Sequence, residues 1–250
     1  MTFERVLFAT DFSKISNRIF KSLPFSDVTL VHVININSVV GLRAGFNIDE
    51  WLGYEIDFAC RKLSSMVEQL NDRGIKARFV CPIPVGDPAT EIVNTARRLG
   101  VSAIVVGARG KSVDKDILLG SVAEGVIRRS DIPVVVVRNG LKFDRLLLAH
   151  DLSKGAWNIL NYIDSKVVIV HVTNGSEALA RSKLSNLNGK VEKVVIRRGE
   201  PSKEILKCEE EEDVDAIVLC GYGITADSVL RHSRTSIIYF PNSTLIPGSI

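Results

Sequence analysis

The chain has 250 residues, of which 46% are hydrophobic and 24% are charged, and its formal net charge at pH 7 is +3. This composition is that of an ordinary globular protein with a substantial core, which excludes a largely disordered chain. Because Lys and Arg are interleaved with Asp and Glu, nucleic acid is not an expected partner. The sequence has neither a signal-peptide pattern nor the run of roughly 20 apolar residues that a membrane span needs, so we expect a cytoplasmic protein without membrane contact.

In the first half of the chain, short dense apolar runs alternate with segments of helical periodicity. The runs predict buried strands at 5–9, 28–34, 75–80, 103–106 and 133–137, and the periodic segments predict helices at 13–23, 51–70, 89–99 and 121–129. Strands that alternate with helices in this way favour right-handed crossovers and a parallel sheet covered by helices on both faces.

The second half repeats the first at an offset of about 140, since LFATDFS at 7–13 recurs as LLAHDLS at 147–153. At Gly86 and Gly199 the offset has fallen to 113, which indicates that the second copy has lost the long connection corresponding to 41–73. The predicted fold class is α/β, with two tandem doubly wound parallel five-stranded sheets in a pseudo-dimeric arrangement.

A second deletion removes a loop from the second copy. Between Gly221, aligned with Gly107, and Ala226 the offset falls again from 114 to 103, so about eleven residues are missing there. We therefore assign residues 1–140 to a front module that keeps this loop and residues 141–250 to a shortened rear module that lacks it.

The loop of the front module has glycines at the spacing that a phosphate site requires. Gly107 and Gly110 lack Cβ atoms, so the backbone is expected to turn with positive φ and to present N–H groups to an anion at close range. Gly120 and Ser121 then begin a helix, whose free first-turn N–H groups and positive dipole end attract a phosphate.

Other residues at the ends of neighbouring strands complete a nucleotide-shaped site. Asp11 follows the first strand, where its carboxylate can accept hydrogen bonds from ribose hydroxyls or the adenine amino group. Its alternative role is to cap the helix that begins near residue 12 or 13. Val33 and Val106 are expected to form apolar walls for the base, and Lys111 to face an outer phosphate.

On these residues the chain resembles the universal stress protein family, whose nucleotide-binding members carry the pattern GxxG, nine residues, G[ST]. The resemblance covers both halves and implies sheet order 3-2-1-4-5, bound ATP or AMP that Mg²⁺ could accompany, and two modules paired within the chain through their last strands. A homodimer of whole chains stays open. The nucleotide-binding residues that motif and strand ends together predict are Ala9, Thr10, Asp11, Val33, Val106, Gly107, Arg109, Gly110, Lys111, Gly120, Ser121 and Val122.

The rear module departs from the family pattern. It keeps Asp151 and Gly221, but the chain reaches Thr225 without the loop, and no Gly-Ser pair follows. We expect this module to be an unoccupied structural partner.

Other sites are disfavoured. A P-loop would need a glycine at position 105, which is Val105, and a dinucleotide fingerprint would need glycines where the first strand ends at 10–13. His32 and His171 recur in both copies and are expected to have a core or hydrogen-bonding role, and His150 has no partner that would make it catalytic.

Surface and cysteine chemistry are expected to be unremarkable in function. The acidic run 209–213 is interpreted as a solvated helix end. The four cysteines have no CxxC spacing and are interpreted as reduced core thiols, without a metal site: Cys60, Cys81, Cys208 and Cys220.

Three functions compete. The favoured one is a nucleotide-responsive binding or regulatory module without catalytic residues or metal ligands. The second is a slow Mg-dependent ATPase or phosphotransfer enzyme, with Asp11 or Asp114 holding Mg²⁺ and Lys111 facing the terminal phosphate. The third is a dimerisation scaffold that binds no nucleotide.

Overall fold

The computed structural model describes residues 3–39, 47–110, 119–138, 140–184 and 190–242. The strands form one ten-stranded sheet in the order β3-β2-β1-β4-β5-β10-β9-β6-β7-β8. Each half therefore has the order 3-2-1-4-5, as the resemblance implies. The front strands are β1 (Val6–Ala9), β2 (Asp27–Val31), β3 (Lys76–Phe79), β4 (Ala103–Gly107) and β5 (Val134–Val137), and the rear strands are β6 (Arg145–Ala149), β7 (Lys166–Val172), β8 (Val191–Arg197), β9 (Ala216–Cys220) and β10 (Ser236–Phe240).

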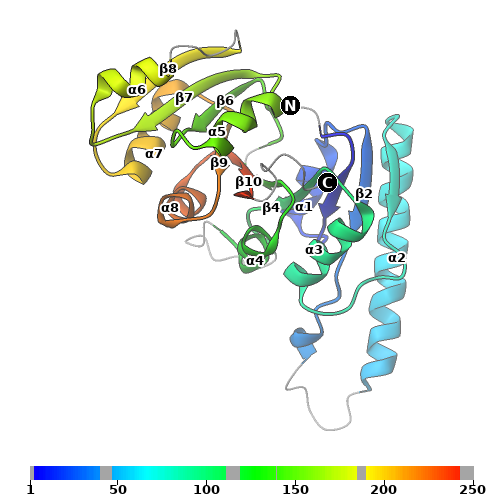
Figure 1. The fold of residues 1–250 in the computed structure, drawn as a ribbon. Helices are drawn as coiled ribbons and strands as arrows, with labels where there is room; N and C mark the ends of the chain where they lie inside the picture. Colours follow the sequence, from blue (N-terminus) through cyan, green and yellow to red (C-terminus); the bar gives the residue numbers. More distant parts are fainter. Residues whose placement is uncertain (1–2, 40–46, 111–118, 139, 185–189, 243–250) are drawn as a thin grey trace.

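The two halves share this sheet because their last strands pair. Strand β10 lies antiparallel to β5, with Ile238 opposite Val135, whereas every other pair of neighbouring strands in the sheet is parallel. Both strands consist almost entirely of buried residues, so an unpaired edge here would expose an apolar surface that promotes association. Figure 1 shows the front half in blue to green and the rear half in green to red on either side of this junction.

Helices cover both faces of the sheet. The front helices are α1 (Lys14–Lys21), α2 (Ile48–Asp72), α3 (Pro88–Leu99) and α4 (Ser121–Arg129), with the 3-10 turn η1 (Ile36–Val39) before α2. The rear helices are α5 (Lys154–Ile159), α6 (Glu177–Lys183), α7 (Pro201–Glu212) and α8 (Ile224–His232), with the turn η2 (Leu160–Tyr162) after α5.

The core follows from the period-two pattern of the strands. Phe8 packs with α1 and α2 on one face, whereas its neighbour Leu7 packs with α3 and α4 on the other. Leu148 and Leu147 make the same division in the rear module. The two apolar faces therefore run through both modules.

The first deletion removes most of one helix. Helix α2 has 25 residues and stands as a long rod beside the front sheet, while the helix in the same place of the rear module, α6, has seven (Figure 1). The predicted start of α2 at 51 is wrong, because Asn47 caps it earlier by accepting the backbone N–H groups of Asp49 and Glu50. No described helix is long and apolar enough to cross a membrane.

Part of the interpretation of the acidic run is wrong. Glu209 is only 5% exposed, and its Oε1 accepts hydrogen bonds from the backbone N–H groups of Arg234 and Thr235. Glu212 is also buried and forms an ion pair with Lys193. These carboxylates fasten α7 to later segments of the chain, which the local sequence pattern does not reveal.

The four cysteines are free thiols. Cys208 is buried as expected, but Cys81 is exposed, so its interpretation as a core residue is wrong. Among the described residues, no group of three or more His, Cys, Asp or Glu side chains could hold a metal ion.

Candidate functional site

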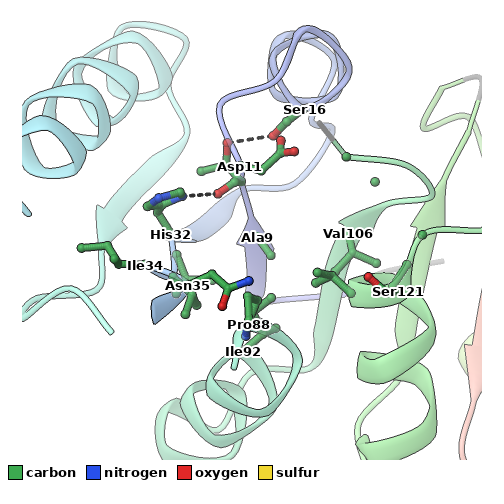
Figure 2. A pocket seen from close by; sticks show the side chains of 18 of the residues that line it. Ala9, Asp11, Ser16, His32, Ile34, Asn35, Pro88, Ile92, Val106 and Ser121 are labelled. Atoms are coloured by element: carbon green, nitrogen blue, oxygen red, sulfur yellow. Dashed lines mark hydrogen bonds between the residues drawn. The ribbon is translucent and has the colours of Figure 1, made fainter. Parts of the chain in front are cut away.

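A cavity of about 620 Å³ opens at the carboxyl ends of β1, β2 and β4, beside the first turn of α4. In Figure 2, His32 and Ile34 lie on one side of β1, and Val106 and Ser121 lie on the other. Eleven of the twelve predicted binding residues line this cavity: Ala9, Thr10, Asp11, Val33, Val106, Gly107, Arg109, Gly110, Gly120, Ser121 and Val122. Lys111 and Asp114 lie outside the described residues.

Asp11 combines the two roles that the sequence leaves open. Its Oδ1 accepts the backbone N–H of Ser13 at 3.0 Å, and Ser13 in turn caps α1 by accepting the N–H of Ser16. Its Oδ2 points to the loop, where it lies 2.9 Å from the position that a Cβ on Gly110 would occupy. One carboxylate oxygen therefore holds the turn while the other faces the cavity.

The glycines of the loop stand where space is tight, and the expectation of positive φ is wrong, since neither Gly107 nor Gly110 has a φ in the left-handed range. A Cβ on Gly107 would come within 3.1 Å of the Arg109 carbonyl oxygen, and one on Gly110 would collide with Asp11. Gly120 caps α4 without a side chain, so the first-turn N–H groups of the helix keep their hydrogen-bonding capacity. We refer to Gly107, Gly110, Gly120 and the first turn of α4 as the anion cradle, because the N–H groups there can donate to an anion.

Arg109 lines the cavity, and Arg138 is close enough to feel its charge. Burial, together with the nearby Arg109, lowers the pKa of Arg138 to about 10, which leaves its guanidinium protonated at neutral pH. Arg138 donates a hydrogen bond to the carbonyl of Leu230 in α8. The Arg109 cation in the cavity wall raises the local potential for an anion.

The other end of the cavity contains residues that the motif did not predict. Trp51 and Glu55 are four residues apart on α2, and therefore share the face that lines the cavity. Further lining residues come from α1, from β2 and the segment that follows it, and from α3 and α4: Ser16, Val31, His32, Ile34, Asn35, Pro88, Ile92 and Ala123. The first deletion is a sequence signal that could have predicted Trp51 and Glu55. The rear module lacks both most of the helix that corresponds to α2 and the loop before α4, and in the front module both of these border the cavity.

The recurring histidines have the expected hydrogen-bonding role. Nδ1 of His32 lies 2.8 Å from the carbonyl oxygen of Thr10, and Nδ1 of His171 lies 2.7 Å from that of His150. The His32 ring also stacks on Phe12, with 4.4 Å between ring centroids. Both histidines tie the first strand of their module to the second.

A model of the universal stress protein family matches residues 2–138, which is more than half of the chain. The chain belongs to the universal stress protein family. Universal stress protein MJ0577 of Methanocaldococcus jannaschii is 35% identical over 156 residues, which cover 54% of this chain and 95% of that protein. Universal stress protein MJ0531 of the same organism is 36% identical over 120 residues, or 47% of this chain and 68% of that one.

The similarity extends to both modules in one solved structure. The crystal structure of a universal stress protein from Archaeoglobus fulgidus has a TM-score of 0.78 and 28% sequence identity, and the match covers 96% of this chain and 97% of that one. The α/β architecture is thus shared over the whole length of a family member.

The rear module of this universal stress protein corrects one alignment. Cys220, rather than Gly221, occupies the place of Gly107, because Cys220 pairs with the last strand of its module as Gly107 does. Gly221 instead donates its N–H to the carbonyl of Phe240, as Ala108 does to that of Val137. Matching glycine to glycine shifted the alignment by one residue, whereas strand hydrogen bonds fix the register.

The second deletion lies between β9 and α8. Gly223 caps α8 as Gly120 caps α4, and Ile224 stands where the front module has Ser121. Only two residues separate Cys220 from Gly223, so the loop that forms the anion cradle has no counterpart in the rear module.

Proposed function

We propose that the front module binds one adenine nucleotide, ATP or AMP, and that the protein acts as a nucleotide-dependent binding or regulatory module. The observation that supports this proposal is the composition of the cavity wall, which includes the glycines and first turn of the anion cradle, then Asp11, and then apolar strand ends. A nucleotide has its phosphate, ribose and base in the same order.

Each part of the ligand has matching chemistry. The N–H groups at the start of α4 and the nearby guanidinium of Arg109 suit a phosphate. Oδ2 of Asp11 can accept hydrogen bonds from ribose hydroxyls, which are donors. Val33 and Ile92 offer apolar surface to a flat base.

Calorimetric titration of the full chain with AMP and with ATP tests the proposal. We expect one nucleotide per chain. Gly120→Val should abolish binding, because a Cβ at this position lies 3.4 Å from the Ala108 carbonyl oxygen and 3.9 Å from the backbone N of Gly110, so the added methyl groups would crowd the cradle. Gly223→Val is the matched control in the rear module, where a Cβ meets nothing within 4 Å, and it should leave binding unchanged.

The same preparation separates a binder from an enzyme. With Mg²⁺ present, a binding module should retain ATP unhydrolysed, whereas an ATPase should release ADP or AMP with turnover. Absence of nucleotide binding at millimolar concentration, in protein that circular dichroism shows to be folded, would reject the proposal and leave the scaffold function.

A further inference from the structure

A second cavity, of about 480 Å³, lies at the carboxyl ends of β6, β7 and β9 in the rear module. It occupies the same place relative to its strands as the front cavity does. The rear module has thus lost its anion cradle and most of one helix without closing the space between them.

The base-side walls of the two cavities correspond residue by residue. Strand register places Leu219 where the front module has Val106. Helices α3 and α7 both begin with a proline, which places Ile205 where the front module has Ile92. Val172 corresponds to Val33, because the segment LVHV at 30–33 recurs as IVHV at 169–172. The rear cavity therefore keeps an apolar site for a flat ring.

The ribose-side group is also retained. Oδ1 of Asp151 accepts the N–H of Ser153 at 2.9 Å, as Asp11 does from Ser13 at 3.0 Å. Within the described part of the chain, Oδ2 of Asp151 has no hydrogen-bond partner. A carboxylate oxygen at this place can accept hydrogen bonds from two neighbouring hydroxyl groups.

The phosphate end, in contrast to the base and ribose ends, has not kept the residues of the front module. Cys220 and Ile224 replace a glycine and a serine of the cradle. Asn242 lies over Gly221, with its Oδ1 2.5 Å from the position that a Cβ on Gly221 would occupy, and thereby narrows this end. Among the described residues that line the cavity, none is Lys or Arg and one, Asp151, is acidic. An anion would meet a negative charge without a compensating cation.

We propose that the rear cavity binds an uncharged purine ribonucleoside, such as adenosine, with its base between Val172 and Leu219 and its ribose hydroxyls on Asp151. The placement of base and ribose rests on the proposed function of the front module, from which it is transferred. The two modules then read different chemical states of one ligand class: the front module binds the phosphorylated form, and the rear module the form without phosphate.

The two tryptophans of the chain report on the two cavities separately. Trp51 lines the front cavity, while Trp157 packs against His150, with 4.5 Å between ring centroids, next to Asp151. In the Trp51→Phe protein we expect adenosine to change the emission of Trp157 and ATP to leave it unchanged. Calorimetry of the unmodified chain saturated with ATP should show one further site for adenosine.

A matched pair of variants assigns the site. Asp151→Asn keeps an oxygen for the N–H of Ser153 but replaces the second oxygen by a donor, so adenosine should bind about tenfold more weakly to the rear module. Asp11→Asn makes the same change in the front module and should weaken AMP binding while leaving the rear site intact. 2′,3′-Dideoxyadenosine, which lacks both hydroxyls, should bind the rear site about tenfold more weakly than adenosine.

No adenosine heat in the ATP-saturated chain, equal binding of ATP at the rear site, or an unaltered affinity in Asp151→Asn would each overturn the inference. AMP binding to the front module is followed independently through Trp51 in the Trp157→Phe protein. Failure there with adenosine bound at the rear refutes only the proposed function, and the reverse result refutes only the present inference.

Discussion

Arg231 of α8 donates to Glu124 of α4 at 2.8 Å, which joins the rear module to the helix whose first turn forms the anion cradle. The contact is one side of a ring of alternating charges. Glu124 also pairs with Arg128 at 2.8 Å, and Asp227 pairs with Arg231 at 3.0 Å and with Arg128 at 3.6 Å. Glu124 and Arg128 of α4 correspond in the repeat to Asp227 and Arg231 of α8. The ring therefore follows the pseudo-twofold relation between the modules.

We predict a measurable coupling across this junction. In a double-mutant cycle with Glu124→Ala and Arg231→Ala, the coupling free energy should be about 0.5 kcal/mol, because both side chains are partly exposed and screened by water. Urea unfolding at low and high salt measures it, and salt should reduce it. The exposed pair Glu177–Arg181 within α6 serves as the control and should show a smaller coupling. Equal coupling in the two pairs would contradict the prediction.

His150 should make stability depend on pH. Burial lowers its pKa to about 4, from an unfolded value near 6.5, although the neighbouring carboxylate of Asp151 opposes the shift. The unfolded chain therefore binds more protons between these values, and the stability that neutral His150 contributes is present above pH 6.5 and is lost as the pH falls towards 4. The loss attributable to this residue should be about 2 kcal/mol.

The variant His150→Thr checks this effect, because Thr10 fills the same position in the front module and also accepts a backbone N–H two residues ahead. Denaturant unfolding at pH 7 and pH 4.5 should show a smaller loss of stability in the variant than in the unmodified chain. His232→Asn, at an exposed position, should keep the original pH profile. An unchanged profile in His150→Thr contradicts the assignment.

Glu209 should be among the most sensitive acidic residues to substitution. Its Oε1 accepts four hydrogen bonds from residues 233–235, including 2.7 Å from Oγ1 of Thr235. Glu209→Ala leaves these donors unsatisfied in a buried place and should cost about 3 kcal/mol of unfolding free energy. Glu209→Gln keeps an acceptor and should cost less.

Glu210 is the control for this measurement, since its partner Arg234 is 78% exposed and its own side chain 55%. Glu210→Ala should change the unfolding free energy by no more than about 0.5 kcal/mol. If Glu209→Ala proved equally mild in chemical denaturation, the buried cap would not exist in solution.

Trp51 should contribute to nucleotide affinity in the front module. Its side chain lines the cavity on the side where we propose that the base binds, so Trp51→Ala removes apolar contact area and should weaken AMP binding about tenfold, while Trp51→Phe should weaken it less. Tyr54 lies on the same helix, is 64% exposed and does not line the cavity, so Tyr54→Ala should leave the affinity unchanged. Calorimetric titration with AMP distinguishes these outcomes, and equal affinities for Trp51→Ala and Tyr54→Ala would place the base elsewhere.

Local patterns carried much of the prediction. Each predicted strand of the front module matches an observed strand, and their ends differ by at most three residues. The agreement arises because buried parallel strands are short runs of apolar residues. The early start of α2 at Ile48 was missed because Asn47, which caps it, lies outside the apolar periodicity. The strand predicted to reach residue 34 ends at Val31, and beyond it only an isolated bridge joins Ile34 to Val85.

The sequence by itself determined the repeated α/β alternation, the two deletions and the glycine spacing of the front loop, because these are encoded in neighbouring residues and in offsets along the chain. Only the tertiary structure decided that Cys220 stands in the place of Gly107, that α2 brings Trp51 to the front cavity, and that Glu209 is buried. These facts depend on how distant segments pack together: on strand register for Cys220, on the orientation of α2 for Trp51, and on the contact of α7 with residues 233–235 for Glu209. Contacts of that kind leave no periodic signal in the sequence that makes them.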